Sequence, residues 1–173
     1  MDTQPPDALA DGEPRALDPR SIHVQRLAGW IFTAIFGAIS FVAIAIVVLT
    51  ADDLPAWLRR LLPFLWLAVT ILLAWHAHRW PVLAYRHTSY RVDALGIEIR
   101  RGVFWRAAIH VPRSRVQHTD VSQGPLERRY GLGTFVIYTA GTDHAKVELS
   151  GLEHGVALRL REHFLPSGDA DAV

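Results

Sequence analysis

The chain has 173 residues, of which 50% are hydrophobic and 20% are charged, and its formal net charge is +1. This composition excludes a natively disordered chain, because such chains combine few apolar residues with a large net charge. The absence of cysteine excludes disulfides, thiolate nucleophiles and cysteine-based zinc sites. The length allows one ordinary domain and a small additional segment.

The first 26 residues contain four prolines and five acidic residues and precede any apolar run. Their composition predicts a disordered tail over residues 1–26. A cleaved signal peptide is disfavoured, because it would have a short basic start and an apolar region of only about 7–15 residues.

Two uncharged runs follow, at 27–49 and 61–78. As helices they would be about 34 Å and 27 Å long, close to the ~30 Å of a hydrocarbon core. A buried core helix is the alternative for either run taken alone. Two such runs separated by an eleven-residue loop favour a transmembrane hairpin.

The basic residues near these runs predict an orientation. Three arginines precede the first run, two lie in the connecting loop and three follow the second run. The excess of positive charge on the cytoplasmic side of membrane proteins therefore places the loop outside and both termini in the cytoplasm.

Small residues recur along the first run at Gly29, Thr33 and Gly37. A stripe of this kind lets another helix approach closely, since packing drives helix association in lipid. We expect a packing face here, against the second run or a partner helix. The alternative is that small residues are simply common in membrane helices.

Residues 79–165 hold thirteen basic and eight acidic residues and predict a mainly-β domain, followed by a disordered tail over 166–173. Short alternating runs separated by turn residues are typical of antiparallel strands; they are 90–92, 97–100, 104–111, 115–122, 134–140 and 145–149. Ser150 and Glu153 fit a capping box that begins a helix with an apolar stripe through Leu160 and Phe164. The order of elements predicts a small barrel or sandwich closed by this helix.

The segment Val111–Gly133, VPRSRVQHTDVSQGPLERRYGLG, resembles the membrane-flanked bacterial PH-like domain family (YdbS-like). Tyr90-Arg91-Val92, Leu95-Gly96-Ile97 and Arg101-Gly102 add to a likeness that covers about 27–164. The resemblance implies two transmembrane helices, then a PH-like domain of two orthogonal sheets and a C-terminal helix in the bacterial cytoplasm. It carries over no catalytic residues. It implies a membrane complex with a longer relative that repeats the domain, or with further copies of this chain.

Four arginines in this segment, Arg113, Arg115, Arg128 and Arg129, are the candidate interface. Arginine prefers phosphate and carboxylate in bidentate geometry, so a basic surface for a partner or for anionic headgroups is one interpretation. The other is that the segment is a folding signature for a β-corner, and both remain open.

No catalytic motif, phosphate-binding loop or metal-binding histidine pair is present in the sequence, so we expect no enzyme, no metal and no cofactor. His110 and His118 would form a site only if they faced each other on neighbouring strands. Phosphoinositide binding is disfavoured because the turn at 92–96 holds an acid and no base, and nucleic-acid binding because the excess charge is small.

Two functions remain open. The first is a non-enzymatic membrane assembly protein whose PH-like domain holds partner chains together. The second is a membrane-surface sensor, or a transport or resistance component, that binds anionic lipid or an amphipathic ligand.

Overall fold

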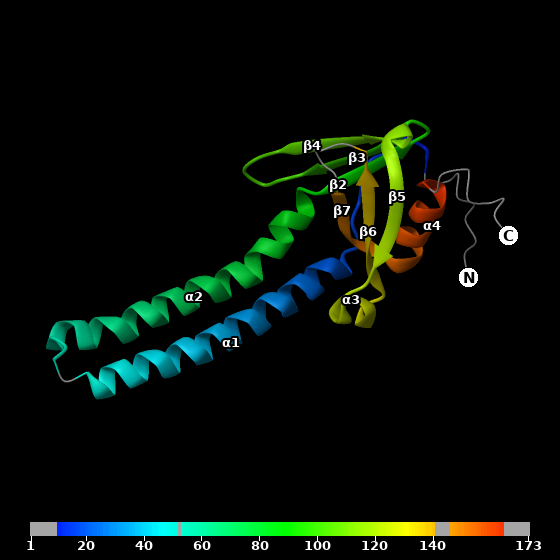
Figure 1. The fold of residues 1–173 in the computed structure, drawn as a ribbon. Coiled ribbons are helices and arrows are strands. Elements are labelled where there is room, and N and C mark those ends of the chain that lie inside the picture. The colour runs from blue at the N-terminus through cyan, green and yellow to red at the C-terminus, as the bar shows by residue number, and fades with distance from the viewer. Residues whose placement is uncertain (1–9, 52, 141–145, 165–173) are drawn as a thin grey trace. The chain divides into compact units, whose positions relative to one another are not determined.

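A computed structural model describes residues 10–51, 53–140 and 146–164 (Figure 1). It divides into two compact units. Residues 25–82 form one unit, and residues 1–24 together with 83–173 form the other. The expected tail at 166–173 lies outside the described residues.

The first unit is a helical hairpin. Helix α1 spans Arg20–Thr50 and helix α2 spans Ala56–Arg86, so both expected apolar runs lie inside longer helices. Both helices are long and apolar enough to cross a membrane, and most of their large apolar side chains are exposed. An apolar surface of this kind is stable in lipid.

Polar groups inside the hairpin are hydrogen-bonded within it. The Trp66 indole N–H donates to the Ser40 hydroxyl at 3.0 Å, and that hydroxyl donates to the Phe36 carbonyl at 2.6 Å. Thr70 donates to the Trp66 carbonyl at 2.9 Å. Such pairing is required because hydrocarbon offers no hydrogen-bond partner.

The second unit contains two antiparallel sheets (Figure 1). The first has the order β1-β2-β3-β4 and the second the order β5-β6-β7. The strands are β1 Arg15–Ala16, β2 Ser89–Asp93, β3 Gly96–Arg101, β4 Ala107–Pro112, β5 Val116–Ser122, β6 Leu132–Thr139 and β7 Lys146–Glu153. The short helices η2 Arg113–Arg115 and α3 Pro125–Arg129 connect strands, and α4 is His154–Phe164.

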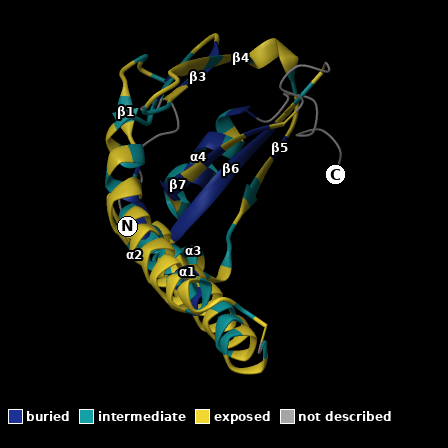
Figure 2. Ribbon diagram, turned by 90° about the vertical axis from the view of Figure 1, so that its left-hand side faces the viewer, coloured by how far each residue is buried: buried dark blue, intermediate teal, exposed yellow. Residues whose placement is uncertain are grey.

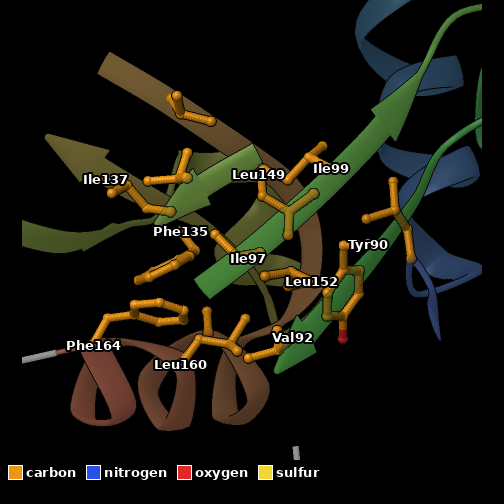
Figure 3. Packing of buried hydrophobic residues seen from close by; sticks show 14 residues of the cluster. Tyr90, Val92, Ile97, Ile99, Phe135, Ile137, Leu149, Leu152, Leu160 and Phe164 are labelled. Carbon is orange, nitrogen blue, oxygen red and sulfur yellow. The ribbon is translucent and has the colours of Figure 1, made fainter. Parts of the chain in front are cut away.

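One hydrophobic core joins the two sheets and α4. Alternate residues of the strands point into it, such as Ile97 and Ile99 of β3, which is the period-two pattern of a half-buried strand. Helix α4 contributes Leu160 and Phe164, and the Phe164 ring lies 6.1 Å from that of Phe135 (Figure 3). The central strand β6 and part of α4 are accordingly buried in Figure 2.

The disordered tail expected over residues 1–26 is corrected for the segment 10–26, while residues 1–9 lie outside the described residues. Residues 15–16 pair with β2, with Ala16 opposite Ser89, and Leu17 is buried in the core. The Asp18 carboxylate accepts the Arg20 N–H at 2.8 Å and so caps α1. Local composition did not indicate this order, because the stabilising contacts come from distant strands.

The capping box expected at Ser150–Glu153 is also corrected, because those residues belong to β7. Gly133 pairs with Leu152, and Leu132 pairs with Glu153. Backbone pairing with β6 therefore continues through the segment and delays the helix to His154. The predicted stripe survives in part, since Leu160 and Phe164 are both buried.

Candidate functional site

The first pair of candidate arginines lies on η2, the turn that connects the two sheets. Arg113 and Arg115 are exposed, and neither makes an ion pair with a carboxylate in the described residues. The Arg113 N–H donates to the Leu95 carbonyl at 2.8 Å, and the Ala140 N–H donates to the Arg115 carbonyl at 3.1 Å. Their backbones thus hold the turn while their guanidinium groups remain available.

The second pair, Arg128 and Arg129, is exposed on α3. The neighbouring Glu127 accepts hydrogen bonds from the Gly124 N–H at 2.8 Å and from the Thr134 hydroxyl at 2.9 Å. Gly131 has a φ of +68°, a conformation that glycine adopts without strain. The non-basic residues around α3 therefore build the corner between β5 and β6, as a folding signature would.

The four arginines do not form one surface. Strand β5, with seven residues, separates η2 from α3, and a strand of that length spans about 23 Å. The two pairs lie toward opposite ends of β5 (Figure 1). Their closeness in sequence suggested one patch, but the extended strand between them makes two.

The histidines do not come together either. His110 lies on β4 and His118 on β5, which belong to different sheets and do not pair. His118 instead contacts the Tyr138 ring, 5.8 Å away. Among the described residues, no group of three or more metal-ligating side chains is present.

The acidic turn between β2 and β3 has a structural role. The Asp93 carboxylate accepts the backbone N–H groups of Leu95 and Gly96, each at 2.9 Å. This Asx-type turn sets the hairpin. It orients an acid, not a base, at the turn where a phosphoinositide headgroup would be expected.

Strand β4 forms one edge of the first sheet. It pairs only with β3 in the described part of the chain, and between Ala107 and Pro112 it has no Asp, Glu, Lys or Arg, His110 being its one titratable residue. The other long edge strands carry charges, Asp120 on β5 and both Lys146 and Glu148 on β7. Natural sheets guard their edges with charges, so an uncharged edge favours pairing with another strand.

A hollow of about 200 Å³ accompanies this edge. His110, Val111, Pro112, Arg115 and Thr139 are among its lining residues. The hollow places one candidate arginine beside the uncharged strand, so a partner strand seated here would meet both backbone groups and a positive charge.

The other end of the first sheet is basic and was not singled out from the sequence. A shallow hollow of about 370 Å³ is lined by Arg86, His87, Arg100, Arg101 and Arg106, together with small residues. The β3–β4 connection beside it exposes Phe104 by 80% and Trp105 by 91%. The run RRGVFWR at 100–106 was the available signal, but the aromatic residues were assigned to a strand.

The small residues of α1 lie against α2. A Cβ at Gly29 would be 2.9 Å from the Ala77 Cβ, and one at Gly37 would be 3.6 Å from the Thr70 methyl group. Thr33 is buried and donates to the Gly29 carbonyl at 2.8 Å. Of the two glycines, Gly29 has the closer contact with α2.

Comparison with known proteins agrees with this architecture. The family model of the bacterial PH domain matches residues 26–167. The chain is 33% identical to the transmembrane protein YdbS of Bacillus subtilis (strain 168) over 147 residues, which covers 84% of this chain and 87% of that protein. No solved structure matches the chain.

Proposed function

Because the chain belongs to the bacterial PH domain family, we propose that it is a non-enzymatic assembly protein of the membrane. Its PH-like domain binds the PH-like domain of a related membrane protein, or of a second copy, at the cytoplasmic face. The family is one of membrane proteins rather than of enzymes, which supports a binding role.

The uncharged edge of β4 is the observation that carries this proposal. An exposed strand edge offers a row of backbone donors and acceptors to an added strand. Ala107 and Ala108 are exposed and small, so their side chains do not obstruct such an approach. A relative with the same fold has a corresponding strand, and two such edges side by side would form one continuous antiparallel sheet.

Arg113 and Arg115 add charge selection to this edge. They lie within three residues of Pro112 and are exposed, so an acidic side chain flanking the partner strand would pair with them. Charge complementarity of this kind favours the correct partner and register more than it raises affinity.

Recovery of the complex from native membranes tests the proposal. Tagged full-length chain, purified in mild detergent, should bring down a membrane protein with a PH-like domain, or a second copy, in stoichiometric amount. Ala108→Lys should abolish that recovery, because a charge on the edge opposes strand addition. Ala94→Lys, at an exposed residue of the β2–β3 turn, is the matched control and should leave recovery unchanged. Purification of the chain with lipid alone would contradict the proposal.

The cytoplasmic placement of the domain needs its own test. Asp53 lies between α1 and α2, and Ala94 lies on the domain. The chain contains no cysteine, so each site can carry the single thiol. We expect an impermeant maleimide to label Asp53→Cys in intact cells and to leave Ala94→Cys unlabelled until the cells are opened. The reverse pattern would place the domain outside.

A further inference from the structure

We propose that the tip of the β3–β4 hairpin docks into the headgroup region of the bilayer that holds α1 and α2. Phe104 and Trp105 insert among the lipids, and the adjacent arginines bind anionic phosphates. The inference is independent of the partner proposed for β4. It starts from two large apolar side chains, 80% and 91% exposed, at the end of a hairpin.

The tip has a defined backbone. Gly102 has a φ of +124°, and a Cβ built there would overlap the carbonyl oxygen of Trp105. Only glycine therefore fits, and the turn that presents Phe104 and Trp105 is closed by direct backbone contact. An ordered turn loses little conformational freedom when its aromatic side chains enter the bilayer.

Strand register places this tip at the end of the sheet where β1 leads into α1 and β2 follows α2. Ala16 pairs with Ser89, Ser89 with Arg100, and Arg100 with Ala108. At this row, β1 ends and the chain continues into α1, and β2 begins after the end of α2. The β3–β4 tip extends from the same row, whereas the β2–β3 turn lies at the opposite end of the strands.

The lengths involved match. About eight helical residues separate the end of the apolar run at His78 from Arg86, and they rise about 12 Å. From Arg100 to Trp105 the hairpin extends five residues, or at most about 17 Å. The hairpin is thus at least as long as this rise, and a docked tip would lie at the interface, where tryptophan is favoured.

Charge at the tip suits anionic lipid. Arg86, Arg101 and Arg106 line the basic hollow and make no ion pair with a carboxylate in the described residues, whereas Arg100 contacts Glu98 at 2.7 Å. Guanidinium groups bind phosphate in bidentate geometry, and basic residues beside a membrane are attracted to anionic headgroups. The aromatic residues thus suit the apolar side of the membrane interface, and the arginines suit its phosphate layer.

Spin-label accessibility in nanodiscs tests the proposal on the full chain. A nitroxide on Val103→Cys reports the tip, and one on Ala94→Cys reports the opposite end of the same sheet. In discs containing phosphatidylglycerol, with one chain per disc, we expect a water-soluble nickel complex to reach position 103 at least threefold less than position 94. Equal accessibility at the two positions would overturn the proposal.

Two sets of variants assign the shielding. Phe104→Ser with Trp105→Ser should raise nickel accessibility at 103 to the level at 94. Arg101→Gln with Arg106→Gln should do so in part, and Arg113→Gln with Arg115→Gln, at the other end of the sheet, should not. Shielding that survives loss of both aromatic residues, or that appears only with several chains per disc, would mean protein contact and would refute lipid docking.

Discussion

Removal of the Leu160 side chain tests whether α4 closes the core. Leu160 of α4 is fully buried in the core that joins both sheets to this helix. Truncation of such a leucine to alanine lowers the free energy of unfolding by about 2–5 kcal/mol. A small domain has a total stability of only about 5–15 kcal/mol. The Leu160→Ala variant should therefore lose a large fraction of the stability of the β domain.

Pulse proteolysis of the full chain in detergent micelles, over a urea series, measures this loss in the soluble domain. With a urea dependence of about 1–3 kcal/mol per molar, we expect the midpoint to fall by roughly 2 M. Leu95→Ala is the matched control, because Leu95 is 75% exposed and surface changes stay within about 0.5 kcal/mol. Equal midpoints for Leu160→Ala and Leu95→Ala would show that α4 does not close the core.

Two further perturbations follow from the structure. Gly29→Ala should destabilise the helical hairpin in a detergent unfolding titration, because the added Cβ would be 2.9 Å from the Ala77 Cβ. Gly37→Ala is the control and should not, because its added Cβ would be 3.6 Å from the Thr70 methyl group. Equal effects of the two substitutions would contradict close packing at Gly29. The Arg100 guanidinium, by its hydrogen bond, lowers the pKa of Glu98 from 4.5, so the carboxylate contributes stability that is present above pH 4.5 and is lost as pH falls through the lowered pKa. Thermal melts should then show Glu98→Gln less stable than the wild type at pH 7, by a difference that shrinks as the pH falls below 4.5, and a difference that does not change with pH would contradict this linkage.

Local patterns predicted most of the architecture. Uncharged runs of membrane length predicted α1 and α2, and period-two alternation predicted the strands from β2 to β7. These signals are contained in a few neighbouring residues. The helical spacing of Leu160 and Phe164 in α4 is a local signal of the same kind. They indicate the type of an element without knowledge of its neighbours.

The errors all involve distant contacts. Strand β1 has two residues and exists because Ser89 and Tyr90 pair with it, which local composition cannot indicate. The capping box at Ser150 was compatible with a helix start, but pairing of Leu152 with Gly133 kept the chain extended. The arginines of η2 and α3 were close in sequence, and only the direction of β5 separates them.

The basic tip was missed for a related reason. Phe104 and Trp105 have high strand propensity and were assigned to β4, so their exposure was not anticipated. The β3–β4 ladder ends at the pair Arg101–Ala107, so the connection that begins with Gly102 at positive φ leaves both aromatic residues outside the ladder. A functional surface here depends on where the hairpin turns, and the boundaries of an element are harder to predict from sequence than its type.

Photo-crosslinking from β4 in living cells tests the assembly role most directly. A benzophenone amino acid replaces Ala108 on the strand edge or, as the matched control, Ala94 on the β2–β3 turn. We predict that the probe at 108 forms one dominant adduct with a membrane protein that contains a PH-like domain, or with a second copy of this chain, and that the attachment site maps to that domain. Adducts at 94 in equal yield, or an adduct at 108 with no PH-like domain, would contradict assembly through β4.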